Sequence, residues 1–394
     1  MPTSDATQSG RSEERWRRYF LRSDSARPGH HIEILFDGRE TFPAMLDAIR
    51  TARHEILLEM YTWIDDAVGR LFVDALVNRA RDGVHVQILV DGFGSLTLSD
   101  AARARLLEAG VQLVIFHPMR PWKPRWAWTV RDHRKLLVVD RAVAFTGGLN
   151  LTQEYAPAES GGGDWHDVFA LVRGPAVAEL RAHFLSAWRH ATGRHTRSRA
   201  AKLPAEQADP ANGAAVQVLA ISRFRGRRRI RNHYRFAVRQ ARSTVRIMVG
   251  YFIPDRGWRR VLRNAVRRGV DVRIMFPHVS DVPAVKWATR ATYGRLLRAG
   301  VRIYEWLPSM MHAKVLSIDG VVCSVGTYNL DWRSFKHNWE LSLLIADAAS
   351  AARIEERFTA DVGQCIEIDA LRWSQRGFRI RLIERFFYML RRLL

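Results

Sequence analysis

The 394-residue sequence predicts an α/β protein built from two copies of one unit. Segments of strand character alternate with segments of helical spacing, which favours a sheet covered by helices on both faces. The same series of segments occurs twice along the chain, and each copy ends in the same short pattern of His, Lys, Asp, Gly and Asn. The alternation therefore predicts the fold class, and the repetition predicts two related domains.

The first half shows the alternation most clearly. The expected elements are a strand at 32–36, a helix at 42–53, a strand at 55–63, a helix at 68–81, a strand at 84–90, a helix at 100–108 and a strand at 111–116. Gly83 and Gly110 follow the last two helices, where a helix end favours glycine.

The second half repeats this order. Residues 241–248 match the stretch from residue 52 at an offset of 189, residues 268–274 match 82–88 at 186, and residues 296–303 match 106–113 at 190. We therefore expect an internal duplication. The expected boundaries are a disordered N-terminus at 1–28, a first domain at 29–199, a linker rich in Ala and Pro at 200–215, a second domain at 216–370 and a basic amphipathic helix at 371–394.

The shared pattern is a His, any residue, a Lys, four residues and an Asp. It consists of His133, Lys135 and Asp140 in the first half and of His312, Lys314 and Asp319 in the second, with Asn150 and Asn329 each 17 residues after the His. The chain has only six Lys against 56 Arg, and two of the six stand at the same place in the two copies. From the residue frequencies we expect about 0.01 chance matches to one copy. A retained Lys indicates a site that needs a compact ammonium.

Local geometry assigns the motif residues to different places. The apolar residues after each Lys favour a buried strand, and Asp319 with Gly320 is a two-residue hairpin signal before a returning strand at 321–325. Residues two apart on a strand point to one face, so His and Lys should emerge side by side. The Asp falls at the far corner of the hairpin. We count both Asp with the catalytic motif but expect a mainly structural role for them.

Composition restricts the partners and the compartment. The net charge of +22 predicts attraction to polyanions, either nucleic acid or an anionic membrane surface, although an Arg-rich composition without functional meaning is an alternative. The only cysteines, Cys323 and Cys365, argue against a disulfide framework and favour a reducing compartment. The first 26 residues lack an apolar signal region, and no run of 18 apolar residues occurs, so membrane contact should be peripheral.

Two segments have the composition of membrane-contacting elements. The offset between the halves places an insertion at 118–130 that combines three Trp with Arg and Lys; lipid contact, ordinary loop packing and base stacking on nucleic acid all remain open for it. In 371–394, apolar residues recur at helical spacing opposite Arg. They are Trp373, Phe378, Leu382, Phe386, Leu390 and Leu393. This pattern is typical of an interfacial helix, and docking against the protein's own core is the alternative.

The doubled motif resembles that of the phospholipase D superfamily. The order of features is similar to that of the bacterial cardiolipin synthases, in particular the shorter B type, over roughly residues 30–370. The resemblance implies two phospholipase D-like α-β-α sandwich domains, with mixed sheets, packed about a pseudo-twofold axis. Both His and both Lys would then meet in one pocket.

Two imidazoles facing one phosphate can act as nucleophile and acid, because His titrates near neutrality. One neutral His attacks phosphorus to give a phosphohistidine, and the other protonates the leaving alkoxide and then deprotonates the acceptor. The resemblance makes His133 the nucleophile and His312 the acid and base. The two Lys and the substrate-binding residues Asn150 and Asn329 would stabilise the phosphoryl oxygens.

Further roles follow from the comparison of the copies. Thr327 would add a hydroxyl donor to the phosphate from one side only, because position 148 is Gly. Carboxylates should orient the imidazoles; Glu340 stands where the resemblance places one, and Asp167 is the candidate in the first half. No Cys/His cluster is visible, so we expect no metal and no cofactor.

The leading hypothesis is a phosphatidyltransferase, a cardiolipin synthase that joins two phosphatidylglycerol molecules and releases glycerol. The alternatives are a phospholipase D or nuclease that uses water, and a membrane-binding scaffold with a degenerate site. The expected partners are phosphatidylglycerol and an anionic membrane surface, with no obligatory nucleic acid and no metal. The expected location is the cytoplasmic face of the bacterial cell membrane, with peripheral attachment.

Overall fold

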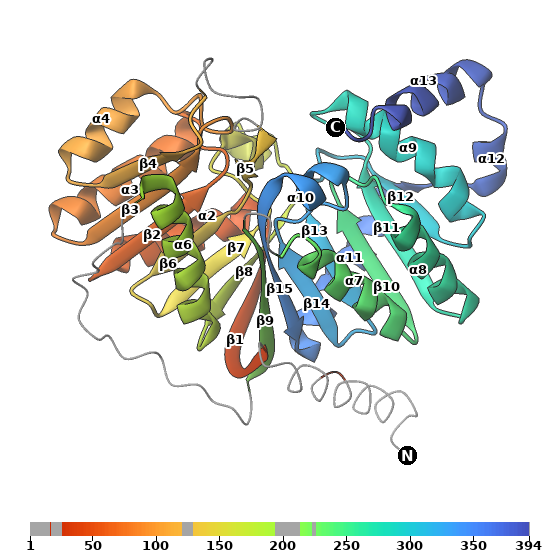
Figure 1. Ribbon diagram of the computed structural model, residues 1–394, viewed down its shortest axis with the longest axis horizontal. Helices are drawn as coiled ribbons and strands as arrows, with labels where there is room; N and C mark the ends of the chain where they lie inside the picture. Colours follow the sequence, from red (N-terminus) through yellow and green to blue (C-terminus); the bar gives the residue numbers. More distant parts are fainter. Residues whose placement is uncertain (1–15, 17–25, 120–128, 194–212, 223–225, 394) are drawn as a thin grey trace.

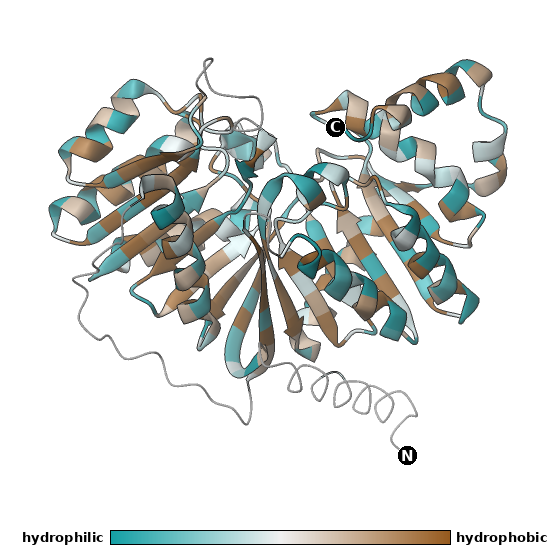
Figure 2. Ribbon diagram, in the orientation of Figure 1, coloured by the Kyte–Doolittle hydropathy of each residue, from teal (hydrophilic) through white to brown (hydrophobic). Residues whose placement is uncertain are grey.

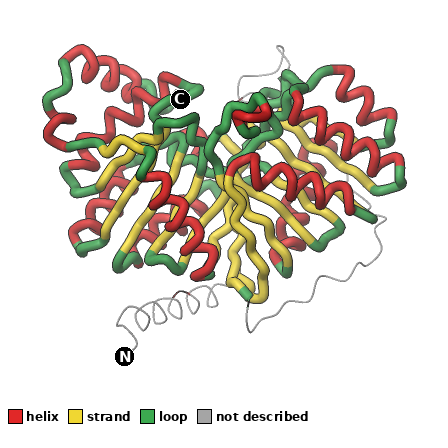
Figure 3. The backbone as a smooth tube through the Cα atoms, turned by 180° about the vertical axis from the view of Figure 1, so that it is seen from behind, coloured by secondary structure: helices red, strands yellow, loops and turns green. Residues whose placement is uncertain are grey.

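The structure is a computed structural model, and it describes residues 16, 26–119, 129–193, 213–222 and 226–393. One mixed, 16-stranded sheet runs through both halves (Figure 1). Its strands follow the order β16-β12-β11-β10-β13-β14-β15-β9-β1-β8-β7-β6-β2-β3-β4, and β5 pairs with β15 off this path. Helices lie in front of the strands in Figure 1 and also in the opposite view of Figure 3, so both faces of the sheet are covered.

In the described residues, the first half carries seven strands of this path and four complete α-helices. They are β1 (Ala26–Phe36), α2 (Asp37–Thr51), β2 (Glu55–Met60), α3 (Ala67–Arg81), β3 (His85–Asp91), α4 (Asp100–Glu108), β4 (Gln112–Phe116), β6 (Leu136–Val139), β7 (Val143–Gly147), β8 (Val168–Arg173) and α6 (Ala176–Thr192). The two-residue strand β5 (Arg131–Asp132) lies between β4 and β6. The strands and helices predicted from the sequence are all present, with shifts of a few residues at their ends.

The second half repeats the series and extends it. Its elements are β9 (Ala214–Ile221), α7 (Arg229–Gln240), β10 (Thr244–Val249), α8 (Arg256–Arg267), β11 (Asp271–Pro277), α9 (Pro283–Leu297), β12 (Arg302–Trp306), β13 (Lys314–Ile318), β14 (Val322–Gly326), α10 (Trp332–Lys336), β15 (Asn338–Ala346), α11 (Ala348–Val362), β16 (Cys365–Glu367), α12 (Ala370–Ser374) and α13 (Phe378–Met389).

The strand order has a pseudo-twofold relation at its centre. Reading outward from the antiparallel pair β1 and β9, the first half runs β1-β8-β7-β6-β2-β3-β4 and the second β9-β15-β14-β13-β10-β11-β12. The predicted fold class, two duplicated α-β-α units with mixed strands about a pseudo-twofold axis, is confirmed. The duplicated sheets additionally join edge to edge, so the seam between the halves is itself hydrogen-bonded sheet.

Alternation along the strands divides the apolar side chains into separate cores. One continuous core includes Leu57 and Met248 from equivalent strands of the two halves and lies under α6 and α11. The alternate residues of the same strands pack under α2, α3 and α4 in the first half and under α7, α8 and α9 in the second. The shared core, together with the joined sheet, holds the two halves in one arrangement.

The C-terminal segment corrects one expectation. The sequence predicts a single helix over 371–394, whereas the structure has α12 and then α13, separated at residues 375–377. The break follows from Trp373, which turns inward and packs on Tyr293 of α9, so that it leaves the apolar stripe to which the spacing assigned it. None of the helices in the described residues is both long and apolar enough to span a bilayer.

Several expectations fall mainly outside the described residues. The N-terminal segment 1–28 is described only at Trp16 and from Ala26 onward, and most of the linker 200–215 and of the Trp-rich insertion 118–130 is not described. The domain boundaries placed there stay predictions.

Candidate active site

The two His-x-Lys pairs stand at equivalent places, each at the beginning of the third strand outward from the seam pair β1 and β9. His133 and Lys135 precede β6, and His312 and Lys314 lie at the start of β13. Each pair is anchored by the opposite half, because His133 N donates to Trp339 O at 3.0 Å and His312 N donates to His166 O at 2.7 Å. The fold therefore brings residues that are 179 positions apart to the same junction.

A carboxylate from the opposite half holds each imidazole. His133 Nδ1 lies 3.1 Å from Glu340 Oε2, and His312 Nδ1 lies 2.9 Å from Asp167 Oδ2. Both carboxylates are completely buried. Because the Nδ1 atoms are engaged, the Nε2 atoms are the ones left for a substrate. The expected carboxylates are thus in place, and they act across the seam.

Three tyrosines, which the sequence analysis missed, complete the walls of the site. The Tyr61 ring lies 4.9 Å from the His133 ring, and the Tyr251 ring lies 5.7 Å from the His312 ring. Lys135 Nζ is 4.9 Å from the Tyr61 ring centre, and Lys314 Nζ is 6.0 Å from that of Tyr251. Tyr61 and Tyr251 stand 190 positions apart, the offset of the repeat, and this match was the signal that could have found them.

Tyr155 acts on one imidazole. Its hydroxyl lies 2.9 Å from His312 Nδ1 and accepts a hydrogen bond from Asn150 Nδ2 at 3.2 Å. Burial, followed by the charge of Asp167, raises the pKa of Tyr155 well above its usual value, so the phenol stays protonated. No repeat match or motif marks this residue in the sequence.

The electrostatics of the site show that both pairs share one environment. Burial, and then the charges of Lys135 and Lys314, lower the pKa of His133 well below its usual value, and the charge of His312 adds to this effect. Burial and Lys314 lower the pKa of His312, while the hydrogen bond and charge of Asp167 act in the opposite direction. The charge of Lys314 thus lowers the pKa of His133, and the charge of Lys135 lowers that of His312, so each imidazole interacts with the lysine of the other half.

The lysines respond in the same way. Burial, and then the charge of Lys314, lower the pKa of Lys135 to about 7. Burial lowers the pKa of Lys314 to about 8, even though Asp167 and Glu340 raise it. Such crowded, buried cationic groups lower their mutual repulsion when an anion binds between them. The site is therefore suited to a phosphate or phosphodiester.

The amides differ in their availability. Asn150 Oδ1 accepts a hydrogen bond from Thr62 N at 3.2 Å, so that both ends of its amide are engaged by protein. Asn329 is buried, and its Oδ1 has no partner among the described residues. A buried amide oxygen without a partner is costly unless a ligand supplies one. Asn329 is therefore the freer of the two predicted substrate-binding amides.

Comparison with known proteins agrees with this geometry. Residues 45–188 and 235–362 match the family model described as "Cardiolipin synthase, PLD-like domain". The chain belongs to this family. It is 34% identical over 352 residues to a "Cardiolipin synthase" of Geobacillus thermodenitrificans, covering 89% of this chain and 70% of the relative. It is 33% identical over 360 residues to "Cardiolipin synthase 2" of Bacillus anthracis, covering 91% and 70%.

Solved structures support the fold of this PLD-like family member. A phosphatidylserine synthase of Haemophilus influenzae superposes with a TM-score of 0.69 at 15% identity, covering 97% of this chain and 100% of the other. A polyphosphate kinase of Porphyromonas gingivalis gives a TM-score of 0.57 at 13% identity, covering 92% of this chain and 53% of the other. At these identities the likeness concerns the fold alone.

The motif Asp residues do not join the PLD-like site, which corrects their inclusion among the catalytic candidates. Asp140 accepts hydrogen bonds from the backbone N–H groups of residues 53, 54 and 55, and Asp319 accepts those of residues 242, 243 and 244. Each lies at the end of its strand away from the Lys and has a positive φ, 50° for Asp140 and 55° for Asp319. They stabilise the hairpin corner, as the local geometry predicts.

Thr327 does not have the expected role of donating a hydrogen bond to the phosphate. Its hydroxyl donates to Glu340 Oε2 and accepts a hydrogen bond from Leu341 N at 3.0 Å, so its proton is not free for a phosphate. Thr327 therefore positions Glu340 instead of binding substrate. At the equivalent position, a Cβ on Gly148 would lie 2.1 Å from Asp167 Oδ1, so the glycine provides the space that Asp167 occupies.

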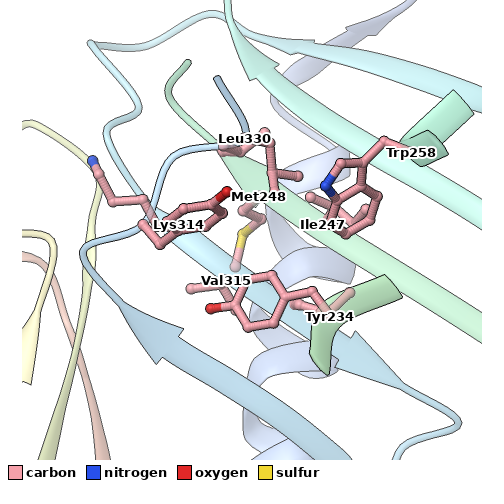
Figure 4. Close-up of a pocket in the computed structure, with 10 residues that line it drawn as sticks. Tyr234, Ile247, Met248, Trp258, Lys314, Val315 and Leu330 are labelled. Atoms are coloured by element: carbon pink, nitrogen blue, oxygen red, sulfur yellow. The ribbon is translucent and has the colours of Figure 1, made fainter. Parts of the chain in front are cut away.

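A small apolar cavity lies behind Lys314. Its volume is about 10 Å³, and Tyr234, Trp258 and the Lys314 stem are among its lining residues. Figure 4 shows the Lys314 ammonium pointing away from this cavity. The space is sufficient for about one water, so it backs the lysine and does not hold substrate. No group of His, Cys, Asp and Glu suited to a metal ion occurs in the described part of the chain.

Proposed function

We propose that the chain is a cardiolipin synthase, a phosphatidyltransferase that transfers a phosphatidyl group from one phosphatidylglycerol to another through a phosphohistidine. The observation that supports this most strongly is the pair of buried imidazoles, each held at Nδ1 by a carboxylate of the opposite half, and each with its pKa lowered by the charges of both lysines. The relatives named cardiolipin synthase extend over most of the chain and supply the reaction class.

In the first step, His133 Nε2 attacks the phosphorus of phosphatidylglycerol. A P–N bond forms, the P–O bond to the glycerol headgroup breaks, and protonated His312 gives its proton to the leaving oxygen. This assignment is supported by the pKa of His133, which is well below its usual value, so that its ring is neutral and nucleophilic. Asp167 raises the pKa of His312 toward its usual value, which suits His312 to be the acid.

In the second step, the terminal hydroxyl of a second phosphatidylglycerol attacks the phosphohistidine. Neutral His312 takes the proton of that hydroxyl, a new P–O bond forms and the P–N bond breaks, which returns His133 to its starting state. The products are cardiolipin and the glycerol released in the first step. Atoms and charge balance without an added cofactor.

The lysines stabilise the negative charge that concentrates on the phosphoryl oxygens during both substitutions. Anion binding raises the pKa values of Lys135 and Lys314 from about 7 and about 8, because the phosphate offsets their repulsion. The unpartnered Oδ1 of Asn329 can accept a hydrogen bond from a hydroxyl of the glycerol headgroup. Peripheral attachment at the cytoplasmic face of the bacterial membrane stays a prediction.

Purified protein incubated with vesicles of labelled phosphatidylglycerol tests the proposal. We expect cardiolipin and glycerol in equal amounts, with both products lost in His133→Asn and His312→Asn. Phosphatidic acid with glycerol, at any lipid concentration, would instead show that water is the acceptor and that the chain is a phospholipase D. Absence of both reactions, together with metal-independent cleavage of single-stranded DNA, would assign the nuclease alternative.

A further inference from the structure

Helix α13 has the reverse of the usual orientation of an amphipathic surface helix. Its buried residue is Glu384, which is 1% exposed, whereas Phe378 is 70% exposed and Met389 is 63% exposed. One stripe of the helix consists of the exposed residues Phe378, Leu382, Phe386 and Met389, at a spacing of three and four residues. Exposed as well are Leu393, just after the helix, and Ile380 and Ile383, outside the stripe. In water, this orientation leaves the apolar stripe without a partner among the residues that the structure describes.

An ion-pair cluster around Glu384 fixes this orientation. Arg376 Nη2 donates to Glu384 Oε2 at 2.7 Å, and Arg290 Nε of α9 lies 3.8 Å from Glu384 Oε1. Arg376 also lies over the ring of buried Trp373, with its Cζ 4.2 Å from the ring centre. Because a buried carboxylate needs its cations, rotating α13 to bury the apolar stripe would leave Glu384 unpaired. The outward stripe is therefore a consequence of built contacts.

The inner face of α13 is connected to the active site. Phe387 and Tyr388 pack on a small core of Ile253, Val285 and Ala288, and Tyr251 packs on the same core. Tyr251 in turn lies against the His312 ring. Arg259 Nη1 donates to Tyr388 Oη at 2.8 Å. The helix is thus connected to a catalytic imidazole through this small core and then Tyr251.

Other exposed apolar side chains gather at the same end of the sheet. Phe93 and Leu96 follow β3, Val279 and Val282 follow β11, and Leu307 follows β12. These strands end where the motif begins, because Lys314 pairs with Val249, the last residue of β10. Figure 1 places α13 at the end of the sheet that also carries β5, directly before His133, and Figure 2 shows hydrophobic positions along α13.

Positive charge borders the stripe. Arg379, Arg381 and Arg385 are exposed on α13, and the whole chain carries a net charge of +22. Arginines beside an outward apolar stripe are suited to the phosphates of anionic lipids, while the apolar residues enter the acyl region. A second copy of this chain would bring the same positive charges together, so charge favours the lipid surface as occupant.

We propose that the outward stripe of α13, together with the apolar loop residues that follow β3, β11 and β12, is the surface by which the protein docks on an anionic phospholipid monolayer. Docking at this end of the sheet turns the two imidazoles toward the headgroups, so a phosphatidyl phosphate reaches them with its acyl chains still in the membrane. The inference rests on the proposed function insofar as the docked lipid is also the substrate.

Vesicle sedimentation with the full chain tests the surface. The variant Phe378→Ser/Leu382→Ser/Phe386→Ser removes three stripe residues, and Leu71→Ser/Leu107→Ser/Ile366→Ser removes three comparably exposed apolar residues from α3, α4 and β16. On vesicles of phosphatidylglycerol and phosphatidylcholine, we expect the stripe variant to bind at least about tenfold more weakly than wild type and the control variant to bind as wild type does. All substituted positions are exposed, and thermal unfolding checks that each variant is folded.

A second measurement locates the contact directly. An environment-sensitive dye attached to Phe386→Cys in a Cys365→Ser background should shift its emission on adding phosphatidylglycerol vesicles, and the same dye on Leu107→Cys should not. Equal vesicle binding by wild type and stripe variant, or no binding of wild type to anionic vesicles, would overturn the proposal. So would a wild-type dimer in light scattering that the stripe variant alone dissociates, because the stripe would then be a contact between copies.

The two proposals fail separately. Binding and dye emission need no turnover, so vesicle docking through α13 without cardiolipin formation would leave the docking surface intact and remove the proposed function. Conversely, detergent-dispersed short-chain phosphatidylglycerol should be converted equally by the wild-type protein and by the stripe variant, because the catalytic residues are unchanged.

Discussion

The two halves of the molecule share a backbone plan and differ at the carboxylate that each sends to the opposite imidazole. The second half supplies Glu340, which Thr327 holds by a hydrogen bond, and the first half supplies the shorter Asp167, which fills the space above Gly148. Both carboxylates reach an Nδ1 atom, at 3.1 Å and 2.9 Å. The duplication therefore preserved the contact while changing the residues that make it.

The difference gives the two imidazoles unequal surroundings. His133 shares its carboxylate with the Thr327 hydroxyl, and burial raises the pKa of Glu340 to about 8. His312 has Asp167 and also the Tyr155 hydroxyl at Nδ1. A symmetric pair of histidines would have no reason to divide the roles of nucleophile and acid. The different residues that contact the two Nδ1 atoms supply that reason.

The largest expected effect tests whether both halves are needed at all. His133→Asn and His312→Asn should each lower kcat on phosphatidylglycerol by at least about 10⁴-fold, because each substitution removes a group that reacts. Steady-state release of labelled glycerol measures this loss. A residual activity within tenfold of wild type in either variant would show that one half suffices.

Removing the carboxylates Asp167 and Glu340 should change the pH dependence of kcat in different ways. We expect Asp167→Asn and Glu340→Gln each to cost about 10–100-fold in kcat, as for other partners that orient a reacting imidazole. Asp167 raises the pKa of His312, so its loss lowers that pKa and moves the high-pH decline of kcat to lower pH. Glu340→Gln should not move this decline. Identical pH profiles in the two variants would contradict the assigned roles.

The residues beside the carboxylates give a smaller and unequal effect. Gly148→Ala places a Cβ against Asp167 and should lower kcat about tenfold or more, because Asp167 must leave His312. Thr327→Ser retains the hydroxyl that donates to Glu340 and should stay within about threefold of wild type. Glycerol release again measures both. A harmless Gly148→Ala would mean that Asp167 does not orient His312.

The smallest effect concerns the lysines. The pKa values of Lys135 and Lys314 in the empty site are about 7 and about 8, and a bound anion raises both, so anion binding takes up protons above pH 7. Affinity for inorganic phosphate should therefore fall by about tenfold between pH 7 and pH 9 beyond the change caused by phosphate's own ionisation. Calorimetry in two buffers measures the proton uptake. Lys135→Met should remove the part of this pH dependence near pH 7, and Lys314→Met the part near pH 8. A wild-type affinity that does not change with pH would contradict the lowered pKa values of the two lysines.

Part of the site could be predicted from the sequence, and there are physical reasons why the rest could not. The placement of His133 and Lys135 directly before a buried strand, and of Asp319 before Gly320 at a hairpin corner, depends on local geometry and was predictable. That Glu340 serves His133 depends on the joined sheet, which no local pattern encodes. Tyr155 was missed because its contact with His312 crosses the seam and has no match in the repeat.

The C-terminal segment shows a further limit. The spacing from Phe378 onward predicts an apolar stripe and leaves open whether it faces protein or lipid. The structure shows that α13 contacts α9 through Glu384 and α8 through Tyr388, while Phe386 stays outward. A helix can thus dock through a buried carboxylate and two aromatic residues while its longer apolar stripe faces outward, which reverses the usual interpretation of such a stripe. Periodicity alone does not give the direction in which a stripe points.

The division of roles between the halves is tested most directly by capturing the covalent intermediate. Phosphatidyl-p-nitrophenol has a leaving group that needs no proton, so His312→Asn should still form the adduct and then accumulate it for lack of a base. Rapid denaturing quench followed by mass spectrometry of peptides should place the phosphatidyl group on His133 in that variant and nowhere in His133→Asn. An adduct on His312 in the His133→Asn variant, or no adduct in either, would contradict the account.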